Sequence, residues 1–186
     1  MGATTKLTFE EFLQLPEAPG NRFELDGGEL IVEPSPTFRH NRICDRISRH
    51  LGEFVSAHRL GAVTVENDFR LGPEVVRNPD VAFVATEPLS RMDVDSSPIE
   101  GAPTLAIEVV LPGNSAQDML AKIHQYLDIG CHAVWVFYPN LKVVEVHDLQ
   151  GIREVAAPAA LQEEMLFDGH AYLLPLSPIF EDDITK

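Results

Sequence analysis

The chain has 186 residues, 45% of them apolar and 23% charged, which is ordinary for a soluble globular protein and suits one domain spanning residues 1–186. Its 14 lysines and arginines stand against 29 aspartates and glutamates, and the resulting net charge of −15 opposes long-range attraction to a nucleic-acid backbone. The sequence has neither the roughly 18 consecutive apolar residues of a membrane span nor the apolar core of a secretory signal, so we expect a cytoplasmic protein with no membrane partner.

A short N-terminal helix is predicted over residues 8–13. Thr8 is followed three residues later by Glu11, which is the spacing of a capping box. Pro16 and then Pro19-Gly20 are expected to end the helix, because proline cannot continue the helical hydrogen-bond pattern.

A β-hairpin is predicted next, from residues 22–25 and 29–32. The intervening Asp26-Gly27-Gly28 supplies the positive φ that tight hairpin turns require. Pro34-Ser35-Pro36 then breaks the second strand and leads into a long helix over about residues 38–58.

This long helix has two stripes. Apolar residues at helical spacing predict a face packed on the core: Ile43, Ile47, Leu51 and Phe54. Arginines spaced by three, four and three residues form a second stripe: Arg39, Arg42, Arg46 and Arg49. His40, Arg39, Arg42 and Arg46 are candidates for contacts with phosphate. A solvated surface, with Asp45 and Glu53 partly offsetting the arginines, is an equal alternative.

Strands dominate the middle of the chain. They are predicted at residues 62–66, 68–71 and 81–86, the last entered directly from Asn78-Pro79-Asp80. Residues 87–103, with three prolines, are expected to form a surface loop.

The strongest pattern is a βαβ-like unit over residues 104–138. Its first strand, residues 104–111, is almost wholly apolar, which predicts a central strand covered on both faces. Residues 114–130 form the predicted helix, ended by Gly130, and residues 133–138 form the second strand.

The remaining residues give weaker patterns. Residues 142–147 alternate polar and apolar side chains, which predicts an edge strand. The C-terminal extension, residues 150–186, ends in Glu181-Asp182-Asp183 and is expected to be solvated or partly ordered. Together the elements predict an α/β fold in which helices flank a mixed β-sheet.

Two carboxylates and one amine are candidates for a hydrolytic site. Asp80 stands at the mouth of one strand and Glu108 inside another, where a carboxylate is costly to bury. This pair suits Mg²⁺, and a bound cation activates water and neutralises charge on a scissile phosphate. Lys122, on the following helix, could orient or deprotonate that water or stabilise the developing charge. The alternative is a surface ion pair between Lys122 and Asp118, one turn earlier.

Short motifs follow one another in a fixed order along the chain: Phe23-Glu24-Leu25 with Gly28 and Glu29, Pro34-Ser35-Pro36 ahead of His40, Pro79-Asp80-Val81, Ile107-Glu108-Val109, Asp118 with Lys122, Tyr126 and Gly130, and Val134-Trp135-Val136. Over about residues 8–148 this set resembles the Uma-type restriction-endonuclease family of the PD-(D/E)XK nuclease superfamily. The resemblance implies a restriction-endonuclease-like core, dependence on Mg²⁺ with Mn²⁺ as a substitute, a DNA substrate and often a homodimer. It also implies that Glu24, Asp80 and Glu108 are acidic ligands and that Lys122 is the catalytic lysine.

The superfamily pattern places a lysine two residues after the second acid, where this chain has Val110. In the family resembled, the lysine usually stands on the following helix, which makes Lys122 the substitute. Such a lysine works only if its ammonium reaches the same point beside the metal.

Three other polar residues have competing interpretations. Glu24 is either an auxiliary acid or a solvent-exposed strand residue, because its neighbours in the strand face the core. His40 either contacts phosphate or serves as a helix cap or surface imidazole. Tyr126 is expected to pack against the sheet. The histidines show no zinc spacing, and Cys44 and Cys131 are expected to be reduced.

Three functions remain open. The favoured one is a Mg²⁺-dependent endonuclease that hydrolyses DNA phosphodiesters. The second is a catalytically degenerate, dimeric interaction module of the same fold, which metal binding would distinguish from the first. The third is a hydrolase that uses paired carboxylates on a neutral substrate such as a glycoside, which the position of Lys122 relative to Asp80 and Glu108 would distinguish.

Overall fold

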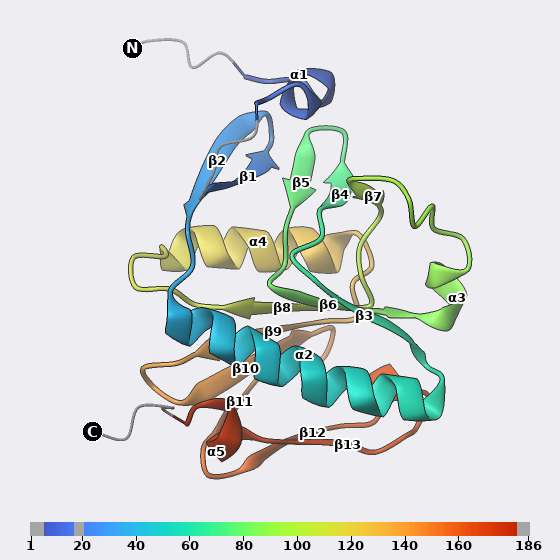
Figure 1. Cartoon of the computed structure of the whole chain (residues 1–186), viewed down its shortest axis with the longest axis vertical. Coiled ribbons are helices and arrows are strands. Elements are labelled where there is room, and N and C mark those ends of the chain that lie inside the picture. The colour runs from blue at the N-terminus through green and yellow to red at the C-terminus, as the bar shows by residue number, and fades with distance from the viewer. Residues whose placement is uncertain (1–5, 17–20, 182–186) are drawn as a thin grey trace.

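Residues 6–16 and 21–181 are described by a computed structural model of the chain (Figure 1). Its helices are α1 (Phe9–Leu13), α2 (Phe38–His58), α3 (Thr86–Leu89), α4 (Ala116–Asp128) and α5 (Leu176–Ile179), with a 3₁₀ turn η1 (Met165–Phe167). Within these ranges, no helix combines the length and the apolarity needed to cross a bilayer. The predicted helix stop at Pro19-Gly20 and the acidic Asp182-Asp183 lie outside the described residues.

The larger sheet confirms the predicted strand–helix–strand unit. Its strands, in spatial order, are β11 (Gly151–Ala156), β10 (Val143–Asp148), β9 (Ala133–Tyr138), β8 (Leu105–Val109), β6 (Val81–Ala85) and β3 (Gly61–Val65). β8 and β9 are parallel and α4 connects them, whereas the other neighbours are antiparallel. The strand predicted at residues 142–147 is confirmed as β10, which pairs with β9 in an antiparallel hairpin, but its predicted position at the edge is wrong, because β11 extends the sheet beyond β10.

A second sheet stands above the first. Its strands, in spatial order, are β2 (Glu29–Pro34), β1 (Asn21–Asp26), β5 (Val75–Arg77), β4 (Phe69–Gly72) and β7 (Ile99–Glu100). The predicted hairpin is confirmed, since Asp26 pairs with Glu29 around Gly27 and Gly28, whose φ angles are 55° and 86°. The expected loop over residues 87–103 instead contains part of α3 and all of β7.

Side-chain hydroxyls start both N-terminal helices. The capping box of α1 is present, since Thr8 Oγ1 accepts the Glu11 N–H at 3.2 Å and the Glu11 carboxylate accepts the Thr8 N–H at 2.8 Å. The cap of α2 is Thr37, whose hydroxyl accepts the backbone N–H of His40 at 3.2 Å. His40 is therefore not the cap of this helix and lies in its first turn.

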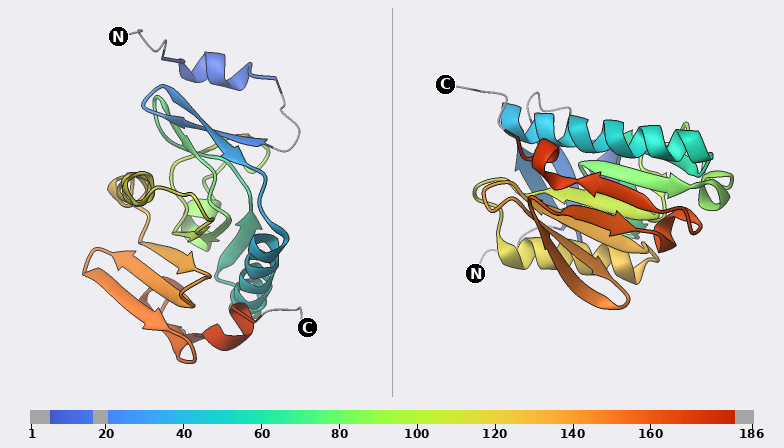
Figure 2. Two further views of the ribbon diagram at one scale, coloured as in Figure 1. Left: turned by 90° about the vertical axis from the view of Figure 1, so that its left-hand side faces the viewer. Right: turned by 90° about the horizontal axis from the view of Figure 1, so that it is seen from below.

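The larger sheet is covered on both faces, as Figure 2 shows, by α2 on one side and α4 on the other. Side chains of β8 alternate between these faces. Leu105, Ile107 and Val109 join the core on the α2 side, whereas Ala106 joins the core on the α4 side. Glu108 shares the face of Ala106 and therefore points towards α4.

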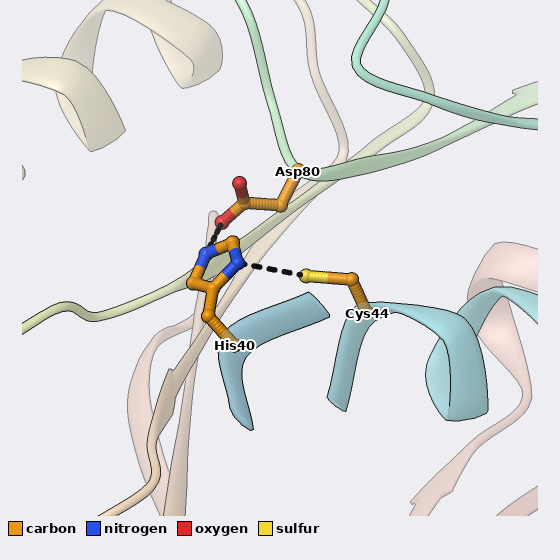
Figure 3. Close-up of side chains that lie close together, drawn as sticks. All are labelled: His40, Cys44 and Asp80. Atoms are coloured by element: carbon orange, nitrogen blue, oxygen red, sulfur yellow. Dashed lines mark hydrogen bonds and ion pairs between the residues drawn. The ribbon is translucent and has the colours of Figure 1, made fainter. Parts of the chain in front are cut away.

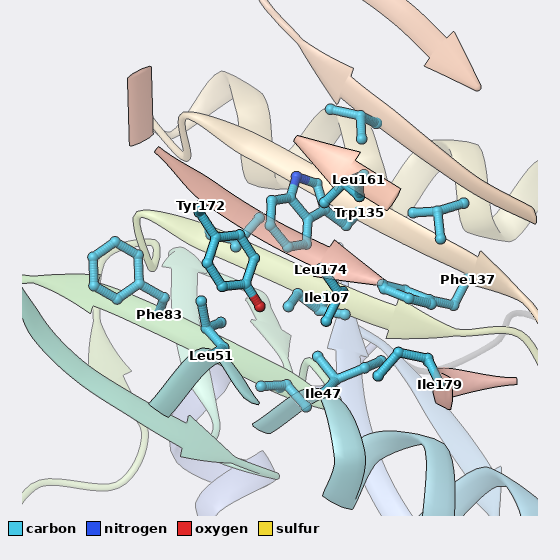
Figure 4. Close-up of a cluster of buried hydrophobic side chains, with 14 of the residues drawn as sticks. Ile47, Leu51, Phe83, Ile107, Trp135, Phe137, Leu161, Tyr172, Leu174 and Ile179 are labelled. Atoms are coloured by element: carbon cyan, nitrogen blue, oxygen red, sulfur yellow. The ribbon is translucent and has the colours of Figure 1, made fainter. Parts of the chain in front are cut away.

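The C-terminal residues complete the core on the α2 side. β12 (Ala160–Glu163) and β13 (Tyr172–Pro175) pair with each other. Their inward side chains and those of α5 are buried against α2 and the sheet (Figure 4): Leu161, Tyr172, Leu174 and Ile179. The expectation of a solvated or partly ordered extension is therefore wrong for residues 150–181.

Candidate active site

The acids and the lysine singled out in the sequence meet at one cavity. It has a volume of about 390 Å³, and its lining includes Glu24 of β1, Asp80 before β6, Glu108 of β8, Lys122 of α4 and His40 of α2. Four elements and the residue that precedes β6, from distant parts of the chain, thus contribute to one polar site.

Glu108 is held by two donors from α4. Its side chain is only 4% exposed, because both faces of β8 are covered. Lys122 Nζ donates to Glu108 Oε2 at 3.2 Å, and the hydroxyl of Tyr126 donates to Oε1 at 3.1 Å. Lys122 and Tyr126 lie one helical turn apart, so both reach the same carboxylate. Tyr126 packs against the sheet as predicted and also positions Glu108.

Lys122 joins two of the acids. Its Nζ lies 2.9 Å from Glu24 Oε1 and 3.2 Å from Glu108 Oε2. The ammonium is therefore directed into the cavity, and the alternative of a surface pair with Asp118 does not describe its position. The ammonium of this helix-borne lysine thus contacts the second acid, Glu108, and that it also reaches the required point beside a metal stays a prediction.

Glu24 is 1% exposed, so the alternative of a solvent-exposed strand residue is wrong. Besides Lys122, Arg77 Nη1 donates to Glu24 Oε2 at 2.9 Å and the backbone N–H of Asn78 donates to Oε1 at 2.8 Å. Arg77 is fixed in turn by Asp26 at 2.7 Å and by Gln125 Oε1 at 2.7 Å. Glu24 thus anchors Lys122 within a buried network that ties β1 and β5 to α4.

Asp80 has a separate set of partners. The backbone N–H of Val109 donates to Asp80 Oδ2 at 2.7 Å, which ties the end of β8 to the start of β6. His40 Nε2 lies 3.2 Å from the same oxygen, and Arg22 Nη2 lies 3.4 Å from Oδ1. His40 is 3% exposed, so it is not a surface imidazole.

Cys44 adds a thiol to this corner of the site (Figure 3). Its Sγ lies 3.6 Å from His40 Nδ1, and ligand atoms of His40, Cys44 and Asp80 lie within 4.8 Å of one another, close enough to hold a metal ion. Burial is the main reason that the pKa of Cys44 is raised well above its ordinary value, which keeps the thiol protonated. A neutral thiol is a poor ligand for a hard cation such as Mg²⁺.

Burial dominates the electrostatics of Glu108 and raises its pKa to about 8. Lys122 opposes this rise, while the nearby carboxylates of Asp80 and Glu24 add to it. For Lys122 itself, burial lowers the pKa but the carboxylates of Glu108 and Glu24 outweigh it, so the pKa is raised and the amine stays charged. When Glu24, Asp80 and Glu108 are all ionised, three negative charges lie close to the Lys122 ammonium.

For Glu24 and Asp80, hydrogen bonds and nearby cations outweigh burial and lower the pKa. Although burial raises the pKa of Glu24, Lys122 and Arg77 hold it below its ordinary value. The pKa of Asp80 is likewise lowered against burial, by His40 and by the Val109 N–H. The pKa of His40 is raised, because its bond to Asp80 outweighs the effect of burial. Glu24 and Asp80 are therefore ionised at neutral pH.

The arginine stripe of α2 lies outside this cavity. Arg42 pairs with Asp45 at 3.0 Å, and Arg46 donates to the carbonyl oxygens of Ile179 and Glu181 at 3.2 and 2.6 Å. Arg39, Arg42 and Arg46 line a separate pocket, to which His40 does not contribute.

Sequence reasoning missed Arg22 and Arg77. Arg22 stands in the predicted hairpin, and Arg77 directly precedes Asn78-Pro79-Asp80, yet nothing in their spacing marks them as partners of buried acids. A signal did exist for His40. It stands three residues before Ile43 and seven before Ile47, on the stripe of α2 that the apolar pattern places against the core.

This fold and this arrangement of acids and lysine define a restriction-endonuclease-like α/β protein. Residues 9–176 match the Uma2 family, described as "Putative restriction endonuclease", and the chain belongs to that family. The match extends beyond the expected residues 8–148 and includes most of the C-terminal segment that completes the core.

A solved structure with the same fold is that of a "putative nuclease belonging to DUF820" from Anabaena variabilis. It shares 23% identity with this chain, covers 94% of this chain and 97% of its own, and gives a TM-score of 0.79. No protein in the curated set matches the sequence. Family membership thus supports a nuclease-like function, and with it a nucleic-acid substrate, at this general level.

Proposed function

We propose that the protein is a Mg²⁺-dependent endonuclease that hydrolyses phosphodiester bonds in DNA. The observation that carries the proposal is the position of the Lys122 ammonium, 3.2 Å from Glu108 and 2.9 Å from Glu24, in a cavity that also holds Asp80. A strand acid, a second acid at a neighbouring strand and a cation beside them are the groups that this hydrolysis requires.

The donor set fits a hard divalent cation. Asp80 and Glu108 would hold Mg²⁺, with Mn²⁺ as a substitute, because both offer carboxylate oxygens at the cavity. Burial, together with the nearby carboxylates of Asp80 and Glu24, raises the pKa of Glu108 to about 8, and a bound cation would oppose that rise by stabilising the ionised carboxylate. When bound, the cation lowers the pKa of a coordinated water and neutralises charge on the phosphate.

The remaining residues have distinct roles in this proposal. Lys122 donates hydrogen bonds at the cavity, where it orients the attacking water or stabilises charge that develops on the phosphate oxygens. Glu24 is an auxiliary acid that positions Lys122, since its own oxygens are already engaged by Arg77 and Asn78.

Arg22 is a further candidate for contact with the scissile phosphate. It lines the cavity, its side chain is 22% exposed, and its contacts with Asn78, Asp80 and Glu66 are long, at 3.3, 3.4 and 3.6 Å. Among the described residues, its buried Nε has no hydrogen-bond partner. A guanidinium with contacts this long can reorient to donate hydrogen bonds to a phosphate, a group that arginine binds well.

The position of Lys122 also bears on the alternative functions. An ammonium in direct contact with Glu108 favours phosphodiester chemistry over a glycosidase, whose paired carboxylates act as acid and base or nucleophile. A degenerate interaction module would retain the fold but would bind neither Mg²⁺ nor Mn²⁺ at millimolar concentration.

Cleavage of supercoiled plasmid DNA tests the proposal. Wild-type protein is expected to nick or linearise the plasmid with Mg²⁺ or Mn²⁺ and to be inactive in EDTA. Glu108→Gln and Lys122→Ala should abolish cleavage, while Glu154→Gln, an exposed acid on β11, should leave it unchanged. If wild-type protein cleaves neither single-stranded, duplex, supercoiled nor branched DNA with either metal, the endonuclease proposal is wrong and the interaction module replaces it.

We also propose a homodimer, as the family resemblance implies. One site hydrolyses one strand, so a cut through both strands of duplex DNA is achieved most simply by two copies of the chain. Sedimentation velocity measures this directly, and a monomer at micromolar concentration in the presence of duplex DNA would contradict it.

A further inference from the structure

A second pocket, of about 250 Å³, adjoins the proposed active site through the first turn of α2. Successive residues of that turn serve the two cavities, since His40 lines the active-site cavity and Arg39 lines the second pocket. The facing wall comes from the connection between β9 and β10 and from residues that follow α5. We call it the α2 pocket.

The α2 pocket concentrates positive charge in a strongly acidic chain. Among the described residues that line it, one is acidic, Glu181, and four are cationic: Arg39, Arg42, Arg46 and Lys142. Arg46 is fixed by backbone carbonyls and forms part of the wall. Arg42 pairs with Asp45, three residues later on the helix surface. An exposed ion pair of this kind is weak enough for a phosphate to compete with it. The whole chain has a net charge of −15, so the described lining of this pocket has the opposite sign of charge.

An exposed aromatic ring stands at the same pocket. Phe38, the first residue of α2, lines it and is 71% exposed. A ring beside cationic groups is the combination on which unpaired bases stack while their phosphates are bound.

The sheet provides a route from the active site to this pocket. β8 and β9 are parallel, and Val109 pairs with Phe137, so the C-terminal ends of both strands lie on the same side of the sheet. The proposed catalytic acids lie at the end of β8, while Pro139 and Asn140, just beyond β9, line the α2 pocket. A nucleic-acid strand that leaves the active site along the C-terminal ends of these two strands passes the first turn of α2.

We propose that the α2 pocket binds a nucleotide of the substrate strand next to the scissile bond. Arg39, Arg42 and Lys142 receive its phosphate, and Phe38 stacks on its unpaired base. The inference rests on the proposed function for the identity of the substrate, and it adds a preference for DNA that is single-stranded or unpaired beside the cleavage site.

Binding of fluorescein-labelled oligothymidine to the full chain tests the inference. Fluorescence anisotropy in EDTA separates binding from cleavage. Removal of the ring in Phe38→Ala should weaken binding about tenfold, as alanine substitution of a base-stacking aromatic residue does. The double variant Arg39→Gln/Lys142→Gln should weaken binding and reduce the slope of log affinity against log salt by about 0.7 for each phosphate that the protein no longer neutralises. The same variants should affect a fully paired duplex of equal length less.

Matched controls use exposed residues that line neither pocket. Leu149→Ala removes an apolar side chain that is 89% exposed, and Arg91→Gln removes a cation whose side chain is 75% exposed. Neither should change affinity or salt slope, and thermal unfolding checks that all variants are folded.

The outcomes for the two proposals are distinguishable. Folded Phe38→Ala and Arg39→Gln/Lys142→Gln proteins with wild-type affinity would overturn the α2 pocket, as would a wild-type protein that binds no oligonucleotide. Equal losses of affinity on single-stranded and duplex DNA would overturn stacking on Phe38. A protein whose binding depends on this pocket but which never cleaves DNA with Mg²⁺ or Mn²⁺ would instead contradict the endonuclease proposal alone.

Discussion

Lys122 is the residue on which the charges of the site depend. Its ammonium contacts two carboxylates that are almost fully buried. Removing one partner of a buried ion pair leaves an uncompensated charge, which costs more than the pair itself contributes. Glu24 would keep Arg77 as a partner, whereas Glu108 would keep only the hydroxyl of Tyr126. Stability and catalysis therefore draw on the same lysine.

Replacement of Lys122 by methionine should destabilise the metal-free protein by about 3 kcal/mol, the lower end of the range for a broken buried pair, since Glu108 can escape by protonation. Urea unfolding measures the loss of stability. The matched control is Lys142→Met at an exposed position, which should change stability little. Glu108→Gln added to Lys122→Met should recover part of the loss, and wild-type stability of the single variant would show that the pair is not formed in solution.

Glu108 also predicts how the stability of the metal-free protein depends on pH. Its pKa rises from 4.5 to about 8 on folding, so between these values the folded state holds a proton that the unfolded state lacks. Loss of this proton as the pH rises destabilises the folded state relative to the unfolded state. The free energy of unfolding should therefore fall as the pH increases through this window. His40, whose pKa is raised above 6.5, acts in the same direction. The lowered pKa values of Glu24 and Asp80 matter only in acid.

Urea unfolding in EDTA from pH 5 to pH 8 measures this dependence, and Glu108→Gln should flatten it. Mn²⁺ requires the ionised carboxylate, so its stabilising effect should increase over the same range. Metal-free wild-type protein that becomes more stable between pH 5 and pH 8 would contradict the assignment of the proton to Glu108.

At the scale of elements, the start of β3 depends on a close approach between backbones. Gly61 has φ of 144° and pairs with Ala85 of β6, and a Cβ at this position would lie 2.0 Å from the Val84 carbonyl oxygen. Backbone cannot move aside as a flexible side chain can. β3 follows α2 and pairs along its length with β6, the strand that follows Asp80.

Gly61→Ala should therefore destabilise the fold by more than 1 kcal/mol, whereas Gly52→Ala, within α2 and with open space around its Cβ, should stabilise it by about 0.5–1 kcal/mol through helix propensity. Thermal unfolding of the two variants gives opposite signs. A neutral effect of Gly61→Ala would mean that β3 and β6 do not approach as closely as the structure shows.

Elements whose signals are local could be predicted from the sequence, and those that depend on distant contacts could not. The hairpin, α2, β8, α4 and β9 follow from turn residues, caps and periodicity within each segment. β5 and β7 are too short to have a period. Burial of Glu24 could not be predicted, because the cover over that face of β1 comes from α4, about 100 residues later. Resemblance to a family, more than spacing, singled out this acid.

Across the whole molecule, the same reasoning explains the error over the C-terminal segment. Alternation in β12 and β13 is confined to four residues each, so the sequence gives little evidence of strands. Yet Leu161 and Leu174 are fully buried in the core beneath α2. The core that supports α2, and through it His40 beside Asp80, is completed only when the last part of the chain has folded.

The net charge of −15 is the whole-molecule property that most affects encounter with DNA. At low ionic strength the repulsion acts over a Debye length of about 30 Å, and at physiological salt over about 8 Å, comparable to the local contacts in the pockets. Screening should therefore remove the repulsion before it removes the attraction of the basic α2 pocket.

We predict that the rate constant for association with DNA rises as salt increases from about 10 to 100 mM, the reverse of the trend for a basic DNA-binding protein. The rate constant for dissociation should rise over the same range, because cations compete for the bound phosphates. Stopped-flow anisotropy in EDTA separates the two rate constants. An association rate constant that falls steadily from the lowest salt concentration would mean that the field of the basic pocket, and not that of the whole chain, governs the approach.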